Sequence, residues 1–299
     1  MASVSAILRT MRPHQWVKNL FVLAPIFFSQ SFFEVDLLAR GLGAFALFCL
    51  MAGTVYLIND IVDRDRDRAH PRKKHRPIAS GELSVSTAKR VAWIFGTATL
   101  AGSIWLDPRF ALVLAIYLTI NLAYSHRLKE WAFVDVAVIS SGFVLRVIAG
   151  GFAAGIFLSE WLLACTFLLA CFLALGKRRH ELAMAKSGQL KKTRQAWEKW
   201  STEHLDVALF VAGGLTVAGY TIYALTASLP DQPLRTRHTP FSSPLLPVTI
   251  PLVVMGLARF FQLARRELTT SPTEAMLRDW WLLAVGLLWV VALIALGIE

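Results

Sequence analysis

Residues 41–67 read GLGAFALFCLMAGTVYLINDIVDRDRD, an uncharged apolar run that passes directly into a cluster of acidic and basic side chains. The run is long enough to cross the hydrocarbon core of a bilayer, which takes about 20 residues of α-helix. A helix satisfies its own backbone hydrogen bonds, and the bilayer core offers no water to do so. The stretch therefore predicts a membrane-spanning helix whose last turns carry charged groups at the membrane surface.

Apolar runs of similar length recur along the 299-residue chain, which is 56% hydrophobic and only 17% charged. No polar stretch between them is long enough for a separate soluble domain. We therefore predict an all-α integral membrane protein with one domain, residues 1–299. About nine spans are expected, and Pro25 interrupts the first; their ranges are roughly 17–33, 37–61, 86–106, 109–125, 131–155, 160–176, 204–228, 243–264 and 279–298.

The chain carries a formal net charge of +11. We predict no nucleic-acid partner, because a basic nucleic-acid binder would not distribute its charge between membrane-length apolar runs. The lipid bilayer, whose cytoplasmic face is anionic, is the better partner for this charge. The N-terminus lacks the apolar core and cleavage site of a signal peptide, so we expect no segment to be removed.

The distribution of Lys and Arg predicts the orientation, because basic residues stay on the cytoplasmic side. With a cytoplasmic N-terminus and nine spans, 25 of the 31 basic residues fall on the cytoplasmic side. The opposite loops hold only Arg40, Arg109, Arg235 and Arg237. This asymmetry favours an odd number of spans and an N-terminus in the cytoplasm.

An acidic cluster ends the second predicted span. Asp60, Asp63 and Asp67 have the spacing i, i+3, i+7, so they share one face if the helix continues to Asp67, and Asn59 lies beside them. Oxygen ligands of this kind suit magnesium. We predict a Mg²⁺ site formed by all four residues, with the three aspartates catalytic. The alternative is a solvated helix end, which is disfavoured because Asp60 and Asp63 adjoin the apolar run.

Basic residues follow the acidic cluster within about ten positions, and they include Lys73 and Arg76. An acidic segment followed by a basic segment suits a ligand whose phosphates bridge a metal and cationic side chains. The alternative is a topology signal that contacts anionic lipid head groups.

Other polar residues are expected on the same side of the membrane. Arg146 lies inside the fifth span, where a permanent charge must face a polar cavity or pair with a carboxylate. His180, in the segment GKRRHEL at 176–182, is either a general base or, as the pattern favours, a solvated loop residue. The complete set of predicted substrate-binding residues is Lys18, Asn19, Lys73, Arg76, Tyr124, Lys129, Arg146, Lys177, Arg178 and Glu181. We expect them to line a cytoplasm-facing cavity that is laterally open to the bilayer.

The segment NDIVDRDRD at 59–67 resembles the NDxxDxxxD signature of the UbiA superfamily of membrane-embedded prenyltransferases. That resemblance implies a nine-helix bundle and a magnesium-dependent active site on the cytoplasmic side. Within the superfamily, five segments together resemble the decaprenyl-phosphate phosphoribosyltransferases: RPHQWVKN at 12–19, NDIVDRDRDRAHPRKKHRPIASG at 59–81, YSHRLK at 124–129, LRVIAGG at 145–151 and GKRRHEL at 176–182.

One departure from the wider superfamily supports the narrower resemblance. Aromatic prenyltransferases of this type carry a second aspartate-rich motif after the sixth span, where it helps to bind a prenyl diphosphate. Here GKRRHEL offers one acid and three permanent cations. Such a segment is poorly suited to a second metal and well suited to a phosphate.

The narrower resemblance implies transfer of 5-phosphoribose from phosphoribosyl pyrophosphate to a polyprenyl phosphate of the decaprenyl type, with release of pyrophosphate. It also implies a bacterial cytoplasmic membrane, a Mg²⁺ cofactor and a role in precursor synthesis for cell-envelope polysaccharide. The sequence does not assign individual cations to individual phosphates, and it is compatible with a homo-oligomer.

Two other functions are alternatives to phosphoribosyl transfer. An aromatic or haem prenyltransferase would use a prenyl diphosphate and should show the second acidic motif. A transporter or lipid flippase should show ionisable residues at mid-membrane depth in several spans, and only Arg146 clearly meets that description.

Overall fold

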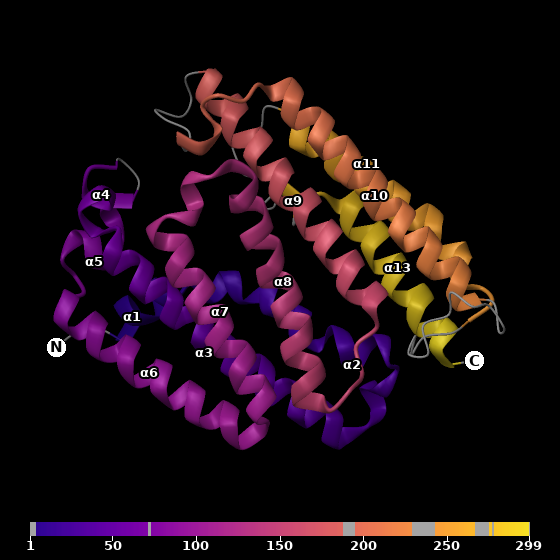
Figure 1. Ribbon diagram of the computed structural model, residues 1–299, viewed down its shortest axis with the longest axis horizontal. Helices are drawn as coiled ribbons and strands as arrows, with labels where there is room; N and C mark the ends of the chain where they lie inside the picture. The colour runs from indigo at the N-terminus through magenta and orange to yellow at the C-terminus, as the bar shows by residue number, and fades with distance from the viewer. Residues whose placement is uncertain are drawn as a thin grey trace. The chain divides into compact units, whose positions relative to one another are not determined.

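The computed structural model describes residues 4–70, 73–187, 195–228, 243–266, 275–276 and 278–298. Arg235 and Arg237 lie outside these ranges. Every regular element within them is helical, as predicted (Figure 1). The elements are α1 (Val4–Met11), η1 (Pro13–Leu23), α2 (Ala24–Phe28), η2 (Ser31–Phe33), α3 (Val35–Val62), α4 (Arg64–Arg68), η3 (Lys73–His75), α5 (Pro77–Ser80), α6 (Val85–Leu106), α7 (Pro108–His126), η4 (Leu128–Glu130), α8 (Ala132–Ala154), α9 (Glu160–Lys186), η5 (Gln195–Trp197), α10 (Thr202–Ser228), η6 (Leu246–Thr249), α11 (Ile250–Arg265) and α13 (Trp280–Ile298), where η marks a 3₁₀ helix.

The chain divides into two compact units, and each is described by itself. The first unit comprises residues 1–128 and 145–157, and the second comprises 129–144 and 158–299. The division passes through α8, which contributes its first half to the second unit and its last half to the first.

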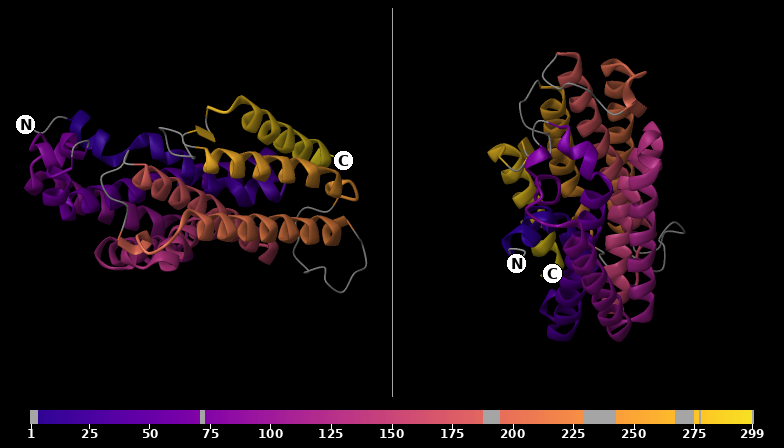
Figure 2. Two further views of the ribbon diagram at one scale, coloured as in Figure 1. Left: turned by 90° about the horizontal axis from the view of Figure 1, so that it is seen from above. Right: turned by 90° about the vertical axis from the view of Figure 1, so that its left-hand side faces the viewer.

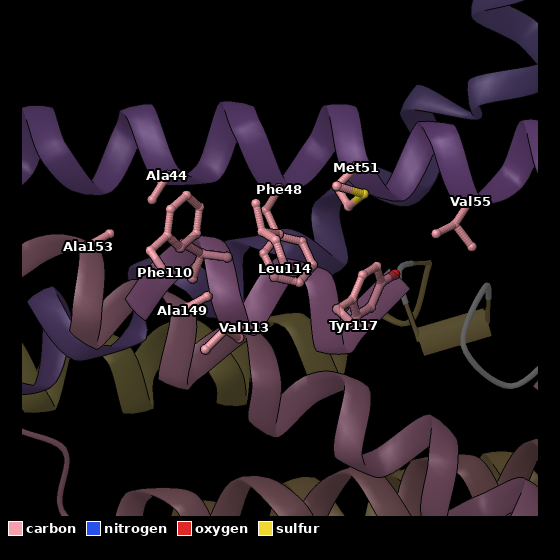
Figure 3. Packing of buried hydrophobic residues seen from close by; sticks show 11 residues of the cluster. Ala44, Phe48, Met51, Val55, Phe110, Val113, Leu114, Tyr117, Ala149 and Ala153 are labelled. Atoms are coloured by element: carbon pink, nitrogen blue, oxygen red, sulfur yellow. The ribbon is translucent and has the colours of Figure 1, made fainter. Parts of the chain in front are cut away.

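Helix α3 is the central element of the first unit, where it packs along α6 and α7. Its residues Ala44, Phe48, Met51 and Val55 recur every three or four positions and face α7 across a buried apolar interface (Figure 3). Phe110, Val113, Leu114 and Tyr117 contribute the matching face of α7, while Ala149 and Ala153 come from α8. This core fixes α3 along most of its length, so the polar residues at its last turn are held in place.

The first predicted span, 17–33, is not one continuous helix. The chain forms the 3₁₀ helix η1, then the five-residue α2, then η2. The interruption expected at Pro25 is confirmed. Pro13 and Pro25 stand at the starts of η1 and α2, where a missing N–H costs least.

Backbone contact between η1 and α8 is unusually close at Gly150. A Cβ atom on Gly150 would lie 1.8 Å from the carbonyl oxygen of Val22. Only glycine fits there, so Gly150 lets the 3₁₀ segment that carries Lys18 and Asn19 pack directly on the helix.

Helices α9, α10, α11 and α13 and the first half of α8 belong to the second unit. Figure 2 shows α10, α11 and α13 running beside one another, and α9 also packs on α10 and α11. Phe172, Leu209 and Phe260 meet in its core, and the Phe172 and Phe260 rings lie 5.2 Å apart.

Helix α9 extends to Lys186, ten residues beyond the predicted end of the sixth span at 176. GKRRHEL is therefore helical. His180 is only 2% exposed, so the expectation that it is a solvated loop residue was wrong. The sequence pattern suggested a loop because charged residues follow the apolar run, but Arg178 and His180 are buried and the others are only partly exposed.

Among the residues that the structure describes, six helical stretches are long and apolar enough to cross a membrane: Val35–Val62, Pro108–Ser125, Ala132–Ala154, Glu160–Lys186, Thr202–Ala227 and Leu246–Arg265. Trp280–Leu296 is a shorter apolar helix. The chain is therefore a multi-pass helical membrane protein. Within the described residues, the predicted spans 17–33 and 86–106 are not among the six, because the first is broken and α6 carries Lys89, Arg90 and many small polar side chains.

Candidate functional site

The acidic cluster lies where α3 gives way to α4. Asp63 caps the C-terminus of α3, yet helical hydrogen bonding continues across the junction. The amide of Asp63 donates to the carbonyl of Asn59 at 2.9 Å, and the amide of Asp67 donates to the carbonyl of Asp63 at 2.8 Å. The predicted spacing of the carboxylates along one stretch of helical turns is thus largely kept.

Asp60 and Asp67 converge on one guanidinium. The Nη1 atom of Arg76 lies 2.6 Å from Oδ2 of Asp67 and 3.2 Å from Oδ1 of Asp60. These aspartates are 3% and 2% exposed, and a buried carboxylate stays ionised only beside a counter-charge. Arg76, predicted from the sequence as a site residue, supplies that charge to both.

Arg12 is a second cation on the same cluster, and the sequence did not single it out. Its Nη2 atom lies 2.5 Å from Oδ1 of Asp60, and its guanidinium carbon lies 4.8 Å from the centre of the Tyr56 ring. Arg12 is 48 positions from Asp60 in the chain. Its position before Pro13, at the start of the segment RPHQWVKN, was the available signal.

The other two predicted metal ligands have separate contacts. Asp63 is partly exposed and lies 3.5 Å from Nη1 of Arg66. The side-chain oxygen of Asn59 accepts a hydrogen bond from the hydroxyl of Ser125 on α7. Among the described residues, no three acidic, His or Cys side chains are grouped as a metal site. The structure thus brings two of the three carboxylates, those of Asp60 and Asp67, onto one guanidinium.

A deeper polar cluster surrounds Arg146, which is 8% exposed. Its Nε atom donates to the side-chain oxygen of Asn19 at 2.8 Å, and Nη2 donates to the hydroxyl of Tyr117 at 3.2 Å. The guanidinium also stacks 4.9 Å from the Phe48 ring and 5.0 Å from the Tyr117 ring. These contacts join η1, α3, α7 and α8 around a permanent charge inside a membrane-spanning helix.

The remaining predicted residues of the first unit differ in their exposure. Lys18 on η1 and Tyr124 on α7 are partly buried, and Lys73 on η3 is exposed. All three belong to the same compact unit as the acidic cluster.

In the second unit, Arg178 is the centre of a buried ionic network. Its Nε atom lies 2.6 Å from Oδ2 of Asp135, and its Nη1 atom donates to Glu181 one turn along α9. The indole N–H of Trp197 donates to the same Asp135 oxygen at 3.1 Å. Asp135 is 0% exposed and Trp197 is 1% exposed.

Asp135 and Trp197 were not predicted. The signal for Asp135 was a single acid within the apolar stretch WAFVDVAVIS, where an ionisable residue needs a partner. Trp197 lies in a polar segment with no readable period, so its burial could not be foreseen.

The neighbouring charges of α9 are also engaged. Arg179 binds Asp206 of α10 at 3.0 Å, and Arg265 of α11 lies 3.5 Å from the same carboxylate. Lys177 and Lys129 are partly buried in this unit. Helices α9, α10 and α11 are therefore tied together at this end through Asp206.

Known sequences resemble this chain over almost its full length. The model of the UbiA prenyltransferase family matches residues 20–283. A protein of Mycolicibacterium smegmatis named decaprenyl-phosphate phosphoribosyltransferase is 35% identical, over 96% of this chain and 91% of that protein. Its namesake from Mycobacterium tuberculosis strain H37Rv is 33% identical, over 96% and 92%.

Solved structures share the fold. A UbiA homologue from Archaeoglobus fulgidus, described as bound to DMAPP and Mg²⁺, superposes with a TM-score of 0.68, at 21% identity, over 98% of this chain and 97% of that one. The extent of the family match and the identity to full-length relatives lead to one conclusion: the chain belongs to the UbiA prenyltransferase family.

Proposed function

We propose that this protein transfers 5-phosphoribose from phosphoribosyl pyrophosphate to a polyprenyl phosphate of the decaprenyl type, releasing pyrophosphate. The observation that carries the proposal is the 33–35% identity, over 96% of the chain, to proteins named for phosphoribosyl transfer to decaprenyl phosphate. The segment GKRRHEL on α9 has one acid against three cations, which disfavours a second metal. Arg178 and Arg179 already bind Asp135, Glu181 and Asp206, so Lys177 is the cation of this segment that we assign to a phosphate.

A divalent cation, magnesium in this proposal, fits the acidic cluster by its chemistry. One nitrogen of Arg76 already lies between the carboxylates of Asp60 and Asp67, so this is a place where positive charge is stabilised by hard oxygen donors. Asp63 and Asn59 are the further ligands we assign. The Archaeoglobus fulgidus homologue, described as bound to Mg²⁺, is consistent with this assignment. When bound, the metal would neutralise the diphosphate leaving group.

The residues of the chain then bind and orient three phosphate-bearing groups. Lys18, Lys73 and Arg76 belong to the unit that holds the acidic cluster, and we assign them to the diphosphate. The lipid phosphate is anionic at neutral pH and attacks the anomeric carbon without a general base. We assign Tyr124 to hydrogen bonding and Arg146 to holding Asn19 in η1.

In the second unit we assign Lys129 and Lys177 to the other phosphates and Glu181 to the ribose hydroxyls. Arg178 was expected to bind substrate directly. Because it is 2% exposed and already binds Asp135 and Glu181, we assign it instead to positioning Glu181.

The membrane arrangement that we propose has nine spanning segments, a cytoplasmic N-terminus and an active site that opens to the cytoplasm and to the bilayer of a bacterial cytoplasmic membrane. The supporting observation is the distribution of basic residues, 25 of 31 on one predicted side. Synthesis of cell-envelope polysaccharide precursors is the role that we infer for the product, and a homo-oligomer remains compatible with this arrangement.

One experiment tests the reaction. Purified protein is incubated with ribose-labelled phosphoribosyl pyrophosphate, decaprenyl phosphate and Mg²⁺, and label is counted in the lipid phase. We expect label in the lipid, equimolar pyrophosphate in the water phase, and loss of both with a chelator. A parallel reaction supplies a prenyl diphosphate and an aromatic acceptor instead. Label absent from the lipid, together with a prenylated aromatic product, would replace the proposal with the prenyltransferase alternative.

A further inference from the structure

Arg12 has a backbone conformation that an arginine rarely adopts. Its φ of 54° and ψ of 63° are left-handed, and it precedes Pro13 at the join between α1 and η1. Such strain persists where surrounding contacts determine it, and it is common at functional sites. The contacts are the Tyr56 ring beneath the guanidinium and the Asp60 carboxylate in front of it.

One oxygen of Asp60 accepts from two guanidinium groups. Both Arg12 and Arg76 direct a nitrogen at Oδ1, at 2.5 and 3.2 Å, and Arg76 also binds Asp67. Two cations therefore balance two buried carboxylates before any ligand binds. In the proposed reaction the diphosphate adds negative charge to this site, and a cation that leaves Asp60 can meet it.

A metal ligated by Asp60 would conflict with Arg12. Magnesium binds carboxylate oxygen at about 2.0–2.1 Å, so an arginine hydrogen-bonded to the same oxygen faces both steric and charge repulsion. Arg76 keeps a second carboxylate, Asp67, when Asp60 is taken. Arg12 is therefore the cation that the metal displaces.

We propose that Arg12 is a further residue of the anion-binding site and that it exchanges one partner, the Asp60 carboxylate, for another, the diphosphate. It neutralises Asp60 while no metal is bound, competes with the metal for that carboxylate, and passes to the diphosphate that enters with the metal. This inference rests on the metal site of the proposed function.

The geometry allows this exchange with little movement. Arg12 is partly exposed, at 24% of its side chain, whereas Asp60 is sealed at 3%. Stacking on Tyr56 is indifferent to rotation of the guanidinium about the ring normal, so the planar group can turn its N–H donors from a carboxylate to a phosphate while it stays on the ring. Phosphate accepts two parallel bonds from such a group.

The exchange can be tested by binding measurements, without any catalytic turnover by the protein. Mn²⁺, which shares the oxygen preference of magnesium, is titrated into full-length protein in detergent, and free Mn²⁺ is followed by electron paramagnetic resonance with and without pyrophosphate. Arg12→Gln should bind Mn²⁺ about five-fold more tightly without pyrophosphate, because a competing cation is gone. In the presence of Mn²⁺ the same variant should bind pyrophosphate about ten-fold more weakly. Arg12→Lys keeps the charge and should fall between Arg12→Gln and the wild type in both measurements.

The matched control is Arg9→Gln, which removes an equal charge three positions earlier, where Arg9 binds Glu82. It should behave as wild type. The effect of Arg12→Gln on Mn²⁺ should also vanish in an Asp60→Asn background, because the competition is for that carboxylate.

Unchanged or weaker Mn²⁺ binding by both Arg12 variants would overturn the exchange, and so would tighter Mn²⁺ binding with unchanged pyrophosphate affinity. These measurements involve neither ribose nor lipid. A protein that shows the exchange but transfers no phosphoribose would refute the proposed function alone, and one that transfers phosphoribose without the opposite shifts would refute the exchange alone.

Discussion

The Asp135 carboxylate and the Arg178 guanidinium form an ion pair at 2.6 Å from which solvent is almost wholly excluded, at 0% and 2% exposure. Within the second unit this pair joins the first turns of α8 to the cytoplasmic end that we predict for α9. A buried pair of this kind is costly to break, because removal of one partner leaves the other charge uncompensated.

We therefore expect Asp135→Leu to destabilise the protein by about 3–5 kcal/mol. Trp197→Phe keeps an aromatic ring but removes the N–H from which Asp135 accepts and part of the buried volume, so it should cost at least about 1–2 kcal/mol. Thermal unfolding in detergent measures both. Trp105→Phe, at a residue that is 89% exposed, is the control and should leave the midpoint unchanged. Equal midpoints for Trp197→Phe and the control would show that the indole hydrogen bond is dispensable.

Asp60→Asn and Asp67→Asn should each reduce transfer activity by about 100-fold or more, since each removes a charged ligand from the proposed metal site. Asp65→Asn removes an acid from the same short segment, but Asp65 is exposed. Initial rates for all three variants should separate the two buried aspartates from the exposed one. Comparable losses in all three would mean that total charge, rather than the convergence on Arg76, decides activity.

Lys177→Ala should raise the KM for a phosphorylated substrate about ten-fold and lower kcat less, because a phosphate-binding cation contributes to ground-state binding. Lys186→Ala, on the exposed end of the same helix, is the comparison. Steady-state kinetics with each substrate varied in turn would also identify which phosphate Lys177 binds. A KM equal to that of Lys186→Ala for both substrates would place Lys177 outside the site.

Low pH should weaken the N-terminal cap of α7. The hydrogen bond from Arg109 lowers the pKa of Asp107 below its ordinary 3.8, and this side chain caps α7 by accepting from the amides of Arg109 and Phe110. A lowered folded-state pKa adds stability that is present above the unfolded value and lost as the pH falls through the folded one. Asp107→Asn should thus melt about 2 °C below wild type at neutral pH.

That difference should shrink as the pH is lowered below the ordinary value of 3.8. Thermal midpoints of both proteins across this range give the measurement. A difference that stays constant with pH would assign the cap to hydrogen bonding without a contribution from charge.

The sequence predicted best those features that depend on residues adjacent in the chain. The bilayer requires long apolar helices, so α3, α7, α8, α9 and α10 could be placed to within a few residues, except for the end of α9. The carboxylates at the end of α3 were identifiable because ionisable groups beside an apolar run need a reason to be there.

Contacts between side chains that are far apart in the sequence could not be predicted in this way. Arg12 meets Asp60 only because η1 folds back along α3, and Trp197 reaches Asp135 across 62 positions. The 3₁₀ character of residues 13–23 was also hidden, since its apolar composition resembles that of a spanning helix. Charge counting gave the candidate cations, but their partners decide which of them can contact a ligand.

The absence of a side chain at Gly150 has a consequence for how the first unit can evolve. Main chain touches main chain at that point, and a peptide group has no alternative rotamer with which to absorb a perturbation. Any larger residue would have to lift the strip that bears Lys18 and Asn19 as a whole. A position with no functional group thereby determines where Lys18, which we assign to the diphosphate, can lie. Substitution there should be tolerated as poorly as substitution of the acids themselves.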